Sequence, residues 1–231
     1  MSANPSDDWA AWFAGKEFSQ DWTSAHYPVW SRVLADWRGR AVEIDVLEIG
    51  SWEGRSAVFF LELMPKSRIV CVDTFAGAHE HLENPDWRAN LPLIEQRFDA
   101  NTAAYKGRVE KIRSNSVAAL DALGKAGRQF DLAYIDGSHR RDDVLVDTLL
   151  AWPMLKLGGR MIWDDYGGGK QYTDADRVQP AVDLFMDWHG GECRVLHRGY
   201  QVIVEKIAAS ATRTSALARR IRKLGRRLSR Y

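Results

Sequence analysis

The sequence is poor in cysteine and contains no long uninterrupted apolar run. Its two cysteines, Cys71 and Cys193, lie far apart, each inside an apolar stretch. This is typical of reduced, buried thiols rather than of a disulfide framework. No window approaches the roughly eighteen apolar residues of a membrane-spanning helix, and the start lacks a basic segment followed by an apolar one. We therefore expect a cytoplasmic protein that is neither exported nor embedded in a membrane.

A strong excess of one charge is also missing, since 32 Lys and Arg face 31 Asp and Glu. The charge is nevertheless distributed unevenly along the sequence. Eight basic residues and no acids lie between Arg213 and Arg230, which leaves a charge of −7 on the remainder. An acidic body offers no basic groove, so we expect no nucleic-acid partner.

The 231 residues, 45% of them hydrophobic, suffice for one sizeable core. We expect a Trp-rich helical segment over 1–40, a main domain over 41–207 and a basic amphipathic helix over 208–231. The first segment should form one or two helices whose tryptophans pack on the core; stacking on a substrate is the alternative. Its tryptophans are Trp9, Trp12, Trp22, Trp30 and Trp37.

Short apolar runs alternate with helix-like stretches through the main domain, which predicts an α/β fold with a parallel sheet covered on both faces. Two of these helices are expected over Ser56 to Met64 and Asp142 to Leu155, with Gly158-Gly159 as a breaker after the second. The predicted strands are Asp45 to Gly50, Arg68 to Asp73, Val109 to Ser114, Phe130 to Asp136, Arg160 to Asp165, Cys193 to His197 and Tyr200 to Ile207.

The last two strands are separated only by Arg198-Gly199, too few residues for a helical crossover. The final strand should therefore run antiparallel to its neighbour. The polar segment Ala76 to Tyr105 is expected to be a helical excursion that could cover a pocket. Its His79 and His81 are expected to be solvated surface residues rather than ligands.

The first strand leads into EIGSWEGRS (residues 48–56), where Gly50 and Gly54 would let the backbone approach a ligand. The spacing fits neither the dinucleotide nor the phosphate-loop pattern. Asp73 ends the second strand, where an acid can hold both hydroxyls of a ribose. An adenosine ligand without a phosphate cradle points to S-adenosylmethionine.

Four motifs in this order, VLEIGSWEGRSAV, CVDTF, YIDGSH and WDDY, resemble class I S-adenosylmethionine-dependent methyltransferases. More narrowly, the chain is similar to the metal-dependent small-molecule O-methyltransferases, which include catechol, caffeoyl-CoA and macrocin-type sugar enzymes. The resemblance spans about Val42 to Ile207. It implies a Rossmann-like, doubly wound, mostly parallel seven-stranded sheet with an antiparallel last strand, flanked by helices.

The resemblance also implies where the cofactor lies. Glu48, Gly50 and Ser56 would line its methionine part, Asp73 its ribose, and the loop after the third strand its adenine. The predicted cofactor-binding residues are Glu48, Gly50, Ser51, Trp52, Ser56, Asp73, Asn115, Ser116 and Asp136.

Asp136, Asp164 and Asp165 follow two strands that are neighbours in this fold, so three carboxylates should meet at one edge. Such anions repel unless a cation joins them, and oxygen ligands favour Mg²⁺, with Mn²⁺ or Ca²⁺ as alternatives. In the resembling family these positions are metal ligands, usually Asp, Asp and Asn. Alternatively, Asp164 or Asp165 caps the next turn and Asp136 forms an Asx-turn.

His139 lies where the catechol-type enzymes carry a basic lysine, and its imidazole suits proton removal near neutral pH. We expect His139 and Asp136 to be catalytic. His139 could instead be a further metal ligand or a surface residue, and macrocin-type enzymes have an acid at the position of Ser138. The predicted activity is O-methylation of a sugar, polyketide or phenolic hydroxyl. The alternatives are a metal-independent methyltransferase using His139 and a non-catalytic cofactor-binding module.

The basic tail carries one apolar stripe at helical spacing. It could pack on the core, lie on an anionic membrane surface or contact a partner through 213–231. The oligomeric state stays open. The residues of the stripe are Leu217, Ile221, Leu224, Leu228 and Tyr231.

Overall fold

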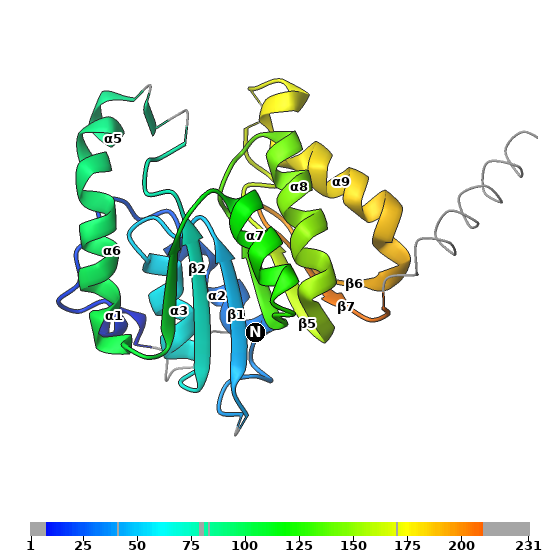
Figure 1. Ribbon diagram of the computed structural model, residues 1–231, viewed down its shortest axis with the longest axis horizontal. Coiled ribbons are helices and arrows are strands. Elements are labelled where there is room, and N and C mark those ends of the chain that lie inside the picture. Colours follow the sequence, from blue (N-terminus) through cyan, green and yellow to red (C-terminus); the bar gives the residue numbers. More distant parts are fainter. Residues whose placement is uncertain (1–7, 41, 79–80, 83, 170, 210–231) are drawn as a thin grey trace, which may run out of the picture.

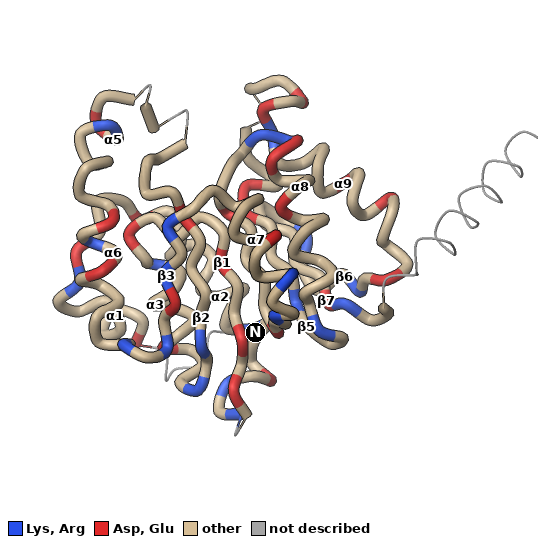
Figure 2. Tube along the Cα trace, in the orientation of Figure 1, with Lys and Arg blue, Asp and Glu red and all other residues tan. Residues whose placement is uncertain are grey.

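The computed structural model describes residues 8–40, 42–78, 81–82, 84–169 and 171–209. The predictions for His79 and for the amphipathic stripe of the tail lie outside these residues. Basic and acidic residues are interspersed along the described trace (Figure 2). Within the described residues, no helix is both long and apolar enough to cross a membrane.

Seven strands form one sheet in the order β3-β2-β1-β4-β5-β7-β6 (Figure 1). The first five strands are parallel, whereas β7 is antiparallel to both β5 and β6. This confirms the predicted Rossmann-like sheet with an antiparallel last strand. The strands are β1 Ile44–Ile49, β2 Ser67–Asp73, β3 Val109–Arg113, β4 Phe130–Ile135, β5 Leu155–Trp163, β6 Cys193–Arg198 and β7 Val202–Lys206.

Helices cover both faces of the sheet, because alternate residues of each strand point to opposite sides. On β1, for example, Val46 packs into one buried cluster and Leu47 into the other. The face of Val46 is covered by α1 Trp9–Trp12, α2 Tyr27–Val33 and α3 Arg55–Leu63, and the short turn η1 Ser24–His26 directly precedes α2. The face of Leu47 is covered by α7 Ser116–Lys125, α8 Arg141–Ala151, η4 Trp152–Met154 and α9 Val178–His189.

The tryptophans of the first segment pack largely as predicted. Trp30 and Trp37 are buried in the core, and Trp9 and Trp12 pack against it partly exposed. The Trp30 indole N–H donates to Gln201 Oε1 at 2.7 Å, which satisfies its polar group. Trp22 differs, since 42% of its surface is exposed. We expect truncation of Trp30 to alanine to cost about 3 to 5 kcal/mol.

The helix predicted over Asp142 to Leu155 ends too late. In the structure α8 ends at Ala151, and Leu155 is the first residue of β5, paired with Phe130. The Gly158-Gly159 pair lies inside β5 rather than before it, where the register with β4 shifts. A Cβ on Gly159 would lie 2.9 Å from the Asp131 carbonyl oxygen. Gly159 therefore serves a close contact between strands, whereas Gly158 has a left-handed φ of +76° and nothing within 4 Å of a Cβ placed there would oppose a side chain. The sequence pattern could not distinguish this arrangement from a helix breaker.

The polar segment between β2 and β3 is helical, as predicted. It contains α5 Pro85–Asn90, η2 Leu91–Leu93, α6 Ile94–Thr102 and η3 Ala103–Tyr105. Two short 3₁₀ turns, η5 Asp174–Asp176 and η6 Gly190–Glu192, flank α9. The prediction that His81 is a solvated residue is wrong. Its ring is partly buried, and Nδ1 accepts a hydrogen bond from the Ala78 amide at 2.8 Å.

Candidate active site

The predicted site residues lie at or just after the carboxyl ends of β1, β2, β3, β4 and β5. The strand order reverses between β1 and β4, because β2 lies on one side of β1 and β4 on the other. In doubly wound sheets, ligands bind outside the carboxyl ends of the strands at such a point. The topology therefore predicts that a ligand binds at this edge of the sheet.

The loop after β1 is held against Asp73 by its backbone. The amides of Ser51 and Trp52 both donate to Asp73 Oδ2 at 2.8 Å, and the Phe75 amide donates to Oδ1 at 2.7 Å. Three backbone donors thus fix the carboxylate at the end of β2. A carboxylate has about four lone-pair sites, so capacity remains for a ligand hydroxyl.

Gly50 has a left-handed φ of +84°, and a Cβ there would lie 2.0 Å from the Asp136 carbonyl oxygen. Glycine is therefore required by the chain itself, because the loop passes directly over the end of β4. From the sequence, Gly50 is expected to let the backbone approach a ligand closely. The contact with β4 is a separate constraint, and it sets the loop beside Asp136.

Three non-glycine residues with positive φ follow strands at this edge: Trp52 at 46°, Phe75 at 54° and Asp165 at 53°. Such conformations cost free energy and persist only where surrounding contacts hold them. Their concentration after β1, β2 and β5 is typical of a functional edge.

Glu48 is fully buried on β1, and neither of its carboxylate oxygens has a hydrogen-bond partner among the described residues. Burial raises its pKa to about 7, although Ser51, Ser56 and Cys71 nearby act to lower it. An unpaired buried carboxyl is costly, and a positively charged donor would relieve it. The ammonium group of the cofactor's methionine part has that chemistry, so the residue fits its predicted place.

The remaining predicted cofactor residues divide into two groups. Ser56 is buried in the first turn of α3, beside Glu48. The Asn115 side chain instead caps α7, because its Oδ1 accepts from the Ala118 amide at 2.9 Å. Ser116 is the first residue of that helix. The loop still lies beside Asp73, the acid predicted to hold the ribose, since the Ser114 amide donates to the Asp73 carbonyl at 3.0 Å.

An aromatic cluster borders the loop after β1. The ring centroid of His81 lies 4.5 Å from that of Trp52 and 5.6 Å from that of Trp22, and Trp87 lies 5.5 Å away. These rings come from three separate segments of the chain. The cluster joins the first segment and the helical excursion to the edge that carries the predicted site.

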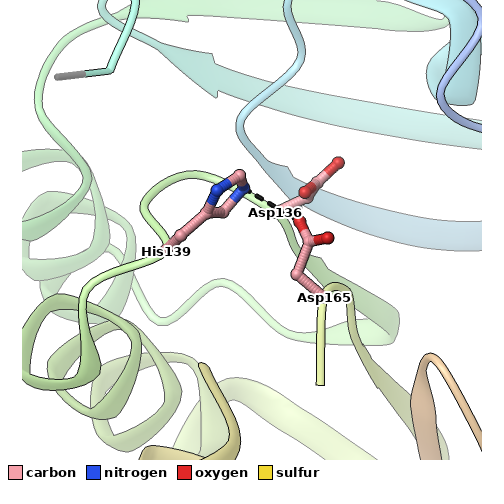
Figure 3. Close-up of side chains that lie close together, drawn as sticks. All are labelled: Asp136, His139 and Asp165. Atoms are coloured by element: carbon pink, nitrogen blue, oxygen red, sulfur yellow. Dashed lines mark ion pairs between the residues drawn. The ribbon is translucent and has the colours of Figure 1, made fainter. Parts of the chain in front are cut away.

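Asp136, His139 and Asp165 form a compact group at the ends of β4 and β5 (Figure 3). Each offers a possible ligand atom, and these atoms all lie within 4.8 Å of one another. His139 Nε2 lies 2.9 Å from Asp165 Oδ2. The juxtaposition follows from the parallel pairing of β4 with β5, in which Ile135 faces Trp163.

The pKa values of the three acids at the ends of β4 and β5 shift in different directions. Burial, with Asp164 and Asp165 close by, raises the pKa of Asp136 well above its ordinary value. Burial and Asp165 also raise the pKa of Asp164. Burial acts on Asp165 too, but the hydrogen bond and charge of His139 outweigh it and lower the pKa of Asp165. A bound cation would relieve the repulsion among these anions.

Asp164 does not belong to the three-residue group. Its Oδ2 accepts from the Tyr134 hydroxyl, and its Oδ1 accepts from the Asp165 amide at 2.8 Å. His26 Nε2 lies 3.9 Å from the same Oδ1. The third sequence-predicted ligand is therefore engaged with the protein in this conformation.

The sequence argument missed three residues around these acids: His26, Tyr134 and Tyr200. The Tyr200 hydroxyl donates to Asp165 Oδ1, and the His26 ring stacks on Tyr200 with centroids 5.4 Å apart. His26 and Tyr200 come from opposite ends of the chain, and no spacing signal links them. Tyr134 carried a signal, since residues two apart on a strand share a face and Tyr134 precedes Asp136 by two.

Comparison with known proteins finds a distant relative in sequence and many proteins of similar fold. An uncharacterized protein, R132, of Acanthamoeba polyphaga mimivirus is 24% identical over 145 residues, which cover 61% of this chain and 58% of that protein. Among solved structures, the MycE methyltransferase with Mg, SAH and mycinamycin VI matches at 19% identity and a TM-score of 0.57. That match covers 88% of this chain and 55% of MycE.

The O-methyltransferase NovP matches at 16% identity and a TM-score of 0.58, over 79% of this chain and 80% of that one. The chain thus spans little more than half the length of R132 and MycE. At these identities the solved structures support the fold.

A family model described as "Methyltransferase domain" matches residues 47–166, which hold the β1 loop, Asp73 and all three predicted acids. The chain therefore belongs to this methyltransferase-domain family and has the class I, S-adenosylmethionine-dependent fold that its motifs resemble.

Proposed function

We propose that the chain transfers a methyl group from S-adenosylmethionine to a hydroxyl group of a small molecule, with a divalent cation beside the reacting groups. The observation that carries the proposal is the Asp136, His139 and Asp165 group next to the loop after β1. It brings two carboxylates and a histidine together at one end of a methyltransferase sheet.

The residues present suit the cofactor. Glu48 would receive the amino group of the methionine part and Asp73 the ribose hydroxyls, with Ser51, Trp52 and Ser56 around them. Asn115 and Ser116 would lie by the adenine, as predicted. When bound, the cofactor supplies an electrophilic methyl group on a sulfonium. The buried Glu48 carboxyl supports this assignment, because no basic residue among those described pairs with it and an ammonium group would provide that positive charge.

Asp136 and Asp165 would hold the cation, with acceptor oxygens or water completing its ligands. Carboxylate oxygens favour Mg²⁺, and the nearby imidazole would also suit Mn²⁺. A bound cation lowers the pKa of a hydroxyl attached to it. Asp164 stays a predicted ligand, although its oxygens face Tyr134 and the Asp165 amide here.

His139 would accept the acceptor's proton. In the tautomer whose Nε2–H donates to Asp165, its Nδ1 is an acceptor, and Asp165 fixes the direction of the ring. The acceptor oxygen then forms a bond to the methyl carbon while the carbon–sulfur bond breaks and its electron pair stays on sulfur. Asp136, at the end of β4, would position the acceptor against the methyl group.

The His139–Asp165 pair also supports the metal-independent alternative, in which this dyad alone removes the proton. The raised pKa values of Asp136 and Asp164 favour the cation, since a dyad does not require two further acids. A sugar, polyketide or phenolic acceptor remains the proposed class. MycE, whose complex contains mycinamycin VI, supports this only by its fold.

Isothermal titration tests the proposal in two steps. The purified chain should bind both S-adenosylhomocysteine and Mn²⁺. The Asp165→Asn variant should bind Mn²⁺ with lower affinity than the wild type. Asp121→Asn is the matched control, because Asp121 is an exposed carboxylate paired with Lys125 on α7. Turnover of S-adenosylmethionine on polyhydroxylated acceptors should then stop in EDTA. Full turnover in EDTA would favour the metal-independent mechanism, in which the His139–Asp165 pair alone removes the proton. Cofactor binding without turnover on any acceptor would favour a non-catalytic cofactor-binding module.

A further inference from the structure

Tyr134 contacts two of the three acids at the site through one hydroxyl group. The hydroxyl lies 2.8 Å from Asp136 Oδ2 and also bonds Asp164 Oδ2. Tyr134 is fully buried on β4, two residues before Asp136 and therefore on the same face of the sheet. One side chain thus links the ends of β4 and β5.

The position of this hydroxyl is fixed by packing. The ring of Tyr134 lies edge-on to Trp30, with centroids 5.4 Å apart, and to Phe60 at 5.7 Å. Both partners are fully buried. A ring enclosed in this way cannot swing, so its hydroxyl is a fixed reference point for any carboxylate bound to it.

A tyrosine hydroxyl has one proton and two acceptor lone pairs. The hydroxyl can donate its proton to one of the two carboxylate oxygens, and the other carboxyl is held when it carries a proton and donates to the hydroxyl oxygen. Asp164 has a second anchor in the Asp165 amide. The hydroxyl consequently fixes the rotation of Asp136, the acid that lies in the group with His139 and Asp165.

We propose that Tyr134 is a positioning residue that orients Asp136 and Asp164 so that Asp136 and Asp165 can hold a divalent cation beside His139. This inference rests on the proposed function, because it requires the cation site. Hydrogen bonds to ligating carboxylates typically raise metal affinity about 10- to 100-fold.

The test is Mn²⁺ binding to the full chain, measured by isothermal titration for the wild type, Tyr134→Phe and Tyr105→Phe. Tyr105 is the matched control, since it is also a buried tyrosine whose hydroxyl bonds a carboxylate, Glu62, at 2.6 Å. We expect Tyr134→Phe to weaken Mn²⁺ binding about 10- to 100-fold. Tyr105→Phe should bind Mn²⁺ as the wild type does, and both variants should keep their affinity for S-adenosylhomocysteine.

Equal Mn²⁺ affinity in Tyr134→Phe and wild type would overturn the role of Tyr134 and leave the cation site standing. No Mn²⁺ binding by the wild type would instead remove the site itself, and this role with it. Should Tyr134→Phe not fold, wild-type crystals soaked in Mn²⁺ decide the question. The Tyr134 hydroxyl should then bond an Asp136 oxygen while Asp136 binds the ion, and loss of that bond would refute the proposal.

Discussion

Glu48 makes the stability of the folded chain depend on pH in a way that can be calculated. Burial raises the pKa of this carboxyl from 4.5 to about 7. Between these values the folded state keeps a proton that the unfolded state has lost, so the contribution of Glu48 to stability is largest below pH 4.5 and is lost as pH rises through 7. Each unit of pKa corresponds to about 1.4 kcal/mol, which gives a loss of about 3 kcal/mol in total.

Glutamine at this position removes the titration and keeps the shape of the side chain. Urea unfolding at pH 5 and pH 7.5 spans most of the range, and the wild type should lose about 2 kcal/mol more than Glu48→Gln between them. Asp136 and Asp147, whose pKa values burial also raises, are present in both proteins and cancel in the difference.

The unfolding of the same two proteins should also be measured with S-adenosylhomocysteine bound. Saturating S-adenosylhomocysteine at pH 7.5 should stabilise the wild type more than Glu48→Gln, because its ammonium group would pair with the ionised carboxylate. Parallel pH dependence in the two proteins would refute the argument that Glu48 is a buried, unpaired acid. Equal stabilisation by the ligand would refute its place in the cofactor site.

Three further predictions concern the site. Asp165→Asn should weaken Mn²⁺ binding about tenfold or more by titration calorimetry while leaving S-adenosylhomocysteine affinity unchanged; unchanged Mn²⁺ affinity would contradict its role. His139→Gln should lower turnover at neutral pH by about 10²- to 10⁴-fold in a methyl-transfer assay, and a smaller loss would point to another base. Gly50→Ala should cost about 2 to 5 kcal/mol in urea unfolding, because it adds a clash with Asp136 to an unfavourable φ. Gly39→Ala, at φ +73° with nothing within 4 Å, should cost only about 1 to 2 kcal/mol, so equal costs would exclude the clash.

The sheet could be predicted because each strand ends in a recognisable signal. Glu48 to Gly50, Asp73 and Asp136 mark the carboxyl ends of β1, β2 and β4, and Arg198-Gly199 is too short for anything but a hairpin. The end of α8 could not be predicted, because Leu155 continues an apolar periodicity that suits either a helix or a strand. Pairing with Phe130 decides it, and that contact is not local.

The site was predictable to the level of strand ends but not of side-chain direction. Parallel pairing brings Asp136 and Asp165 together wherever this fold forms. Whether Asp164 joins them depends on a rotamer, which Tyr134 and the Asp165 amide determine. His26 reaches the same acids only because α2 packs across the sheet, a tertiary contact without a sequence signature.

Anomalous diffraction from a crystal soaked with S-adenosylhomocysteine and Mn²⁺ tests the cation site most directly. We predict one strong anomalous peak from a Mn²⁺ ion bound to oxygens of both Asp136 and Asp165. The ion should lie close to His139 and next to the sulfur of the bound S-adenosylhomocysteine. A cofactor bound in the loop after β1 without any peak there, or with the two carboxylates turned away from each other, would contradict it.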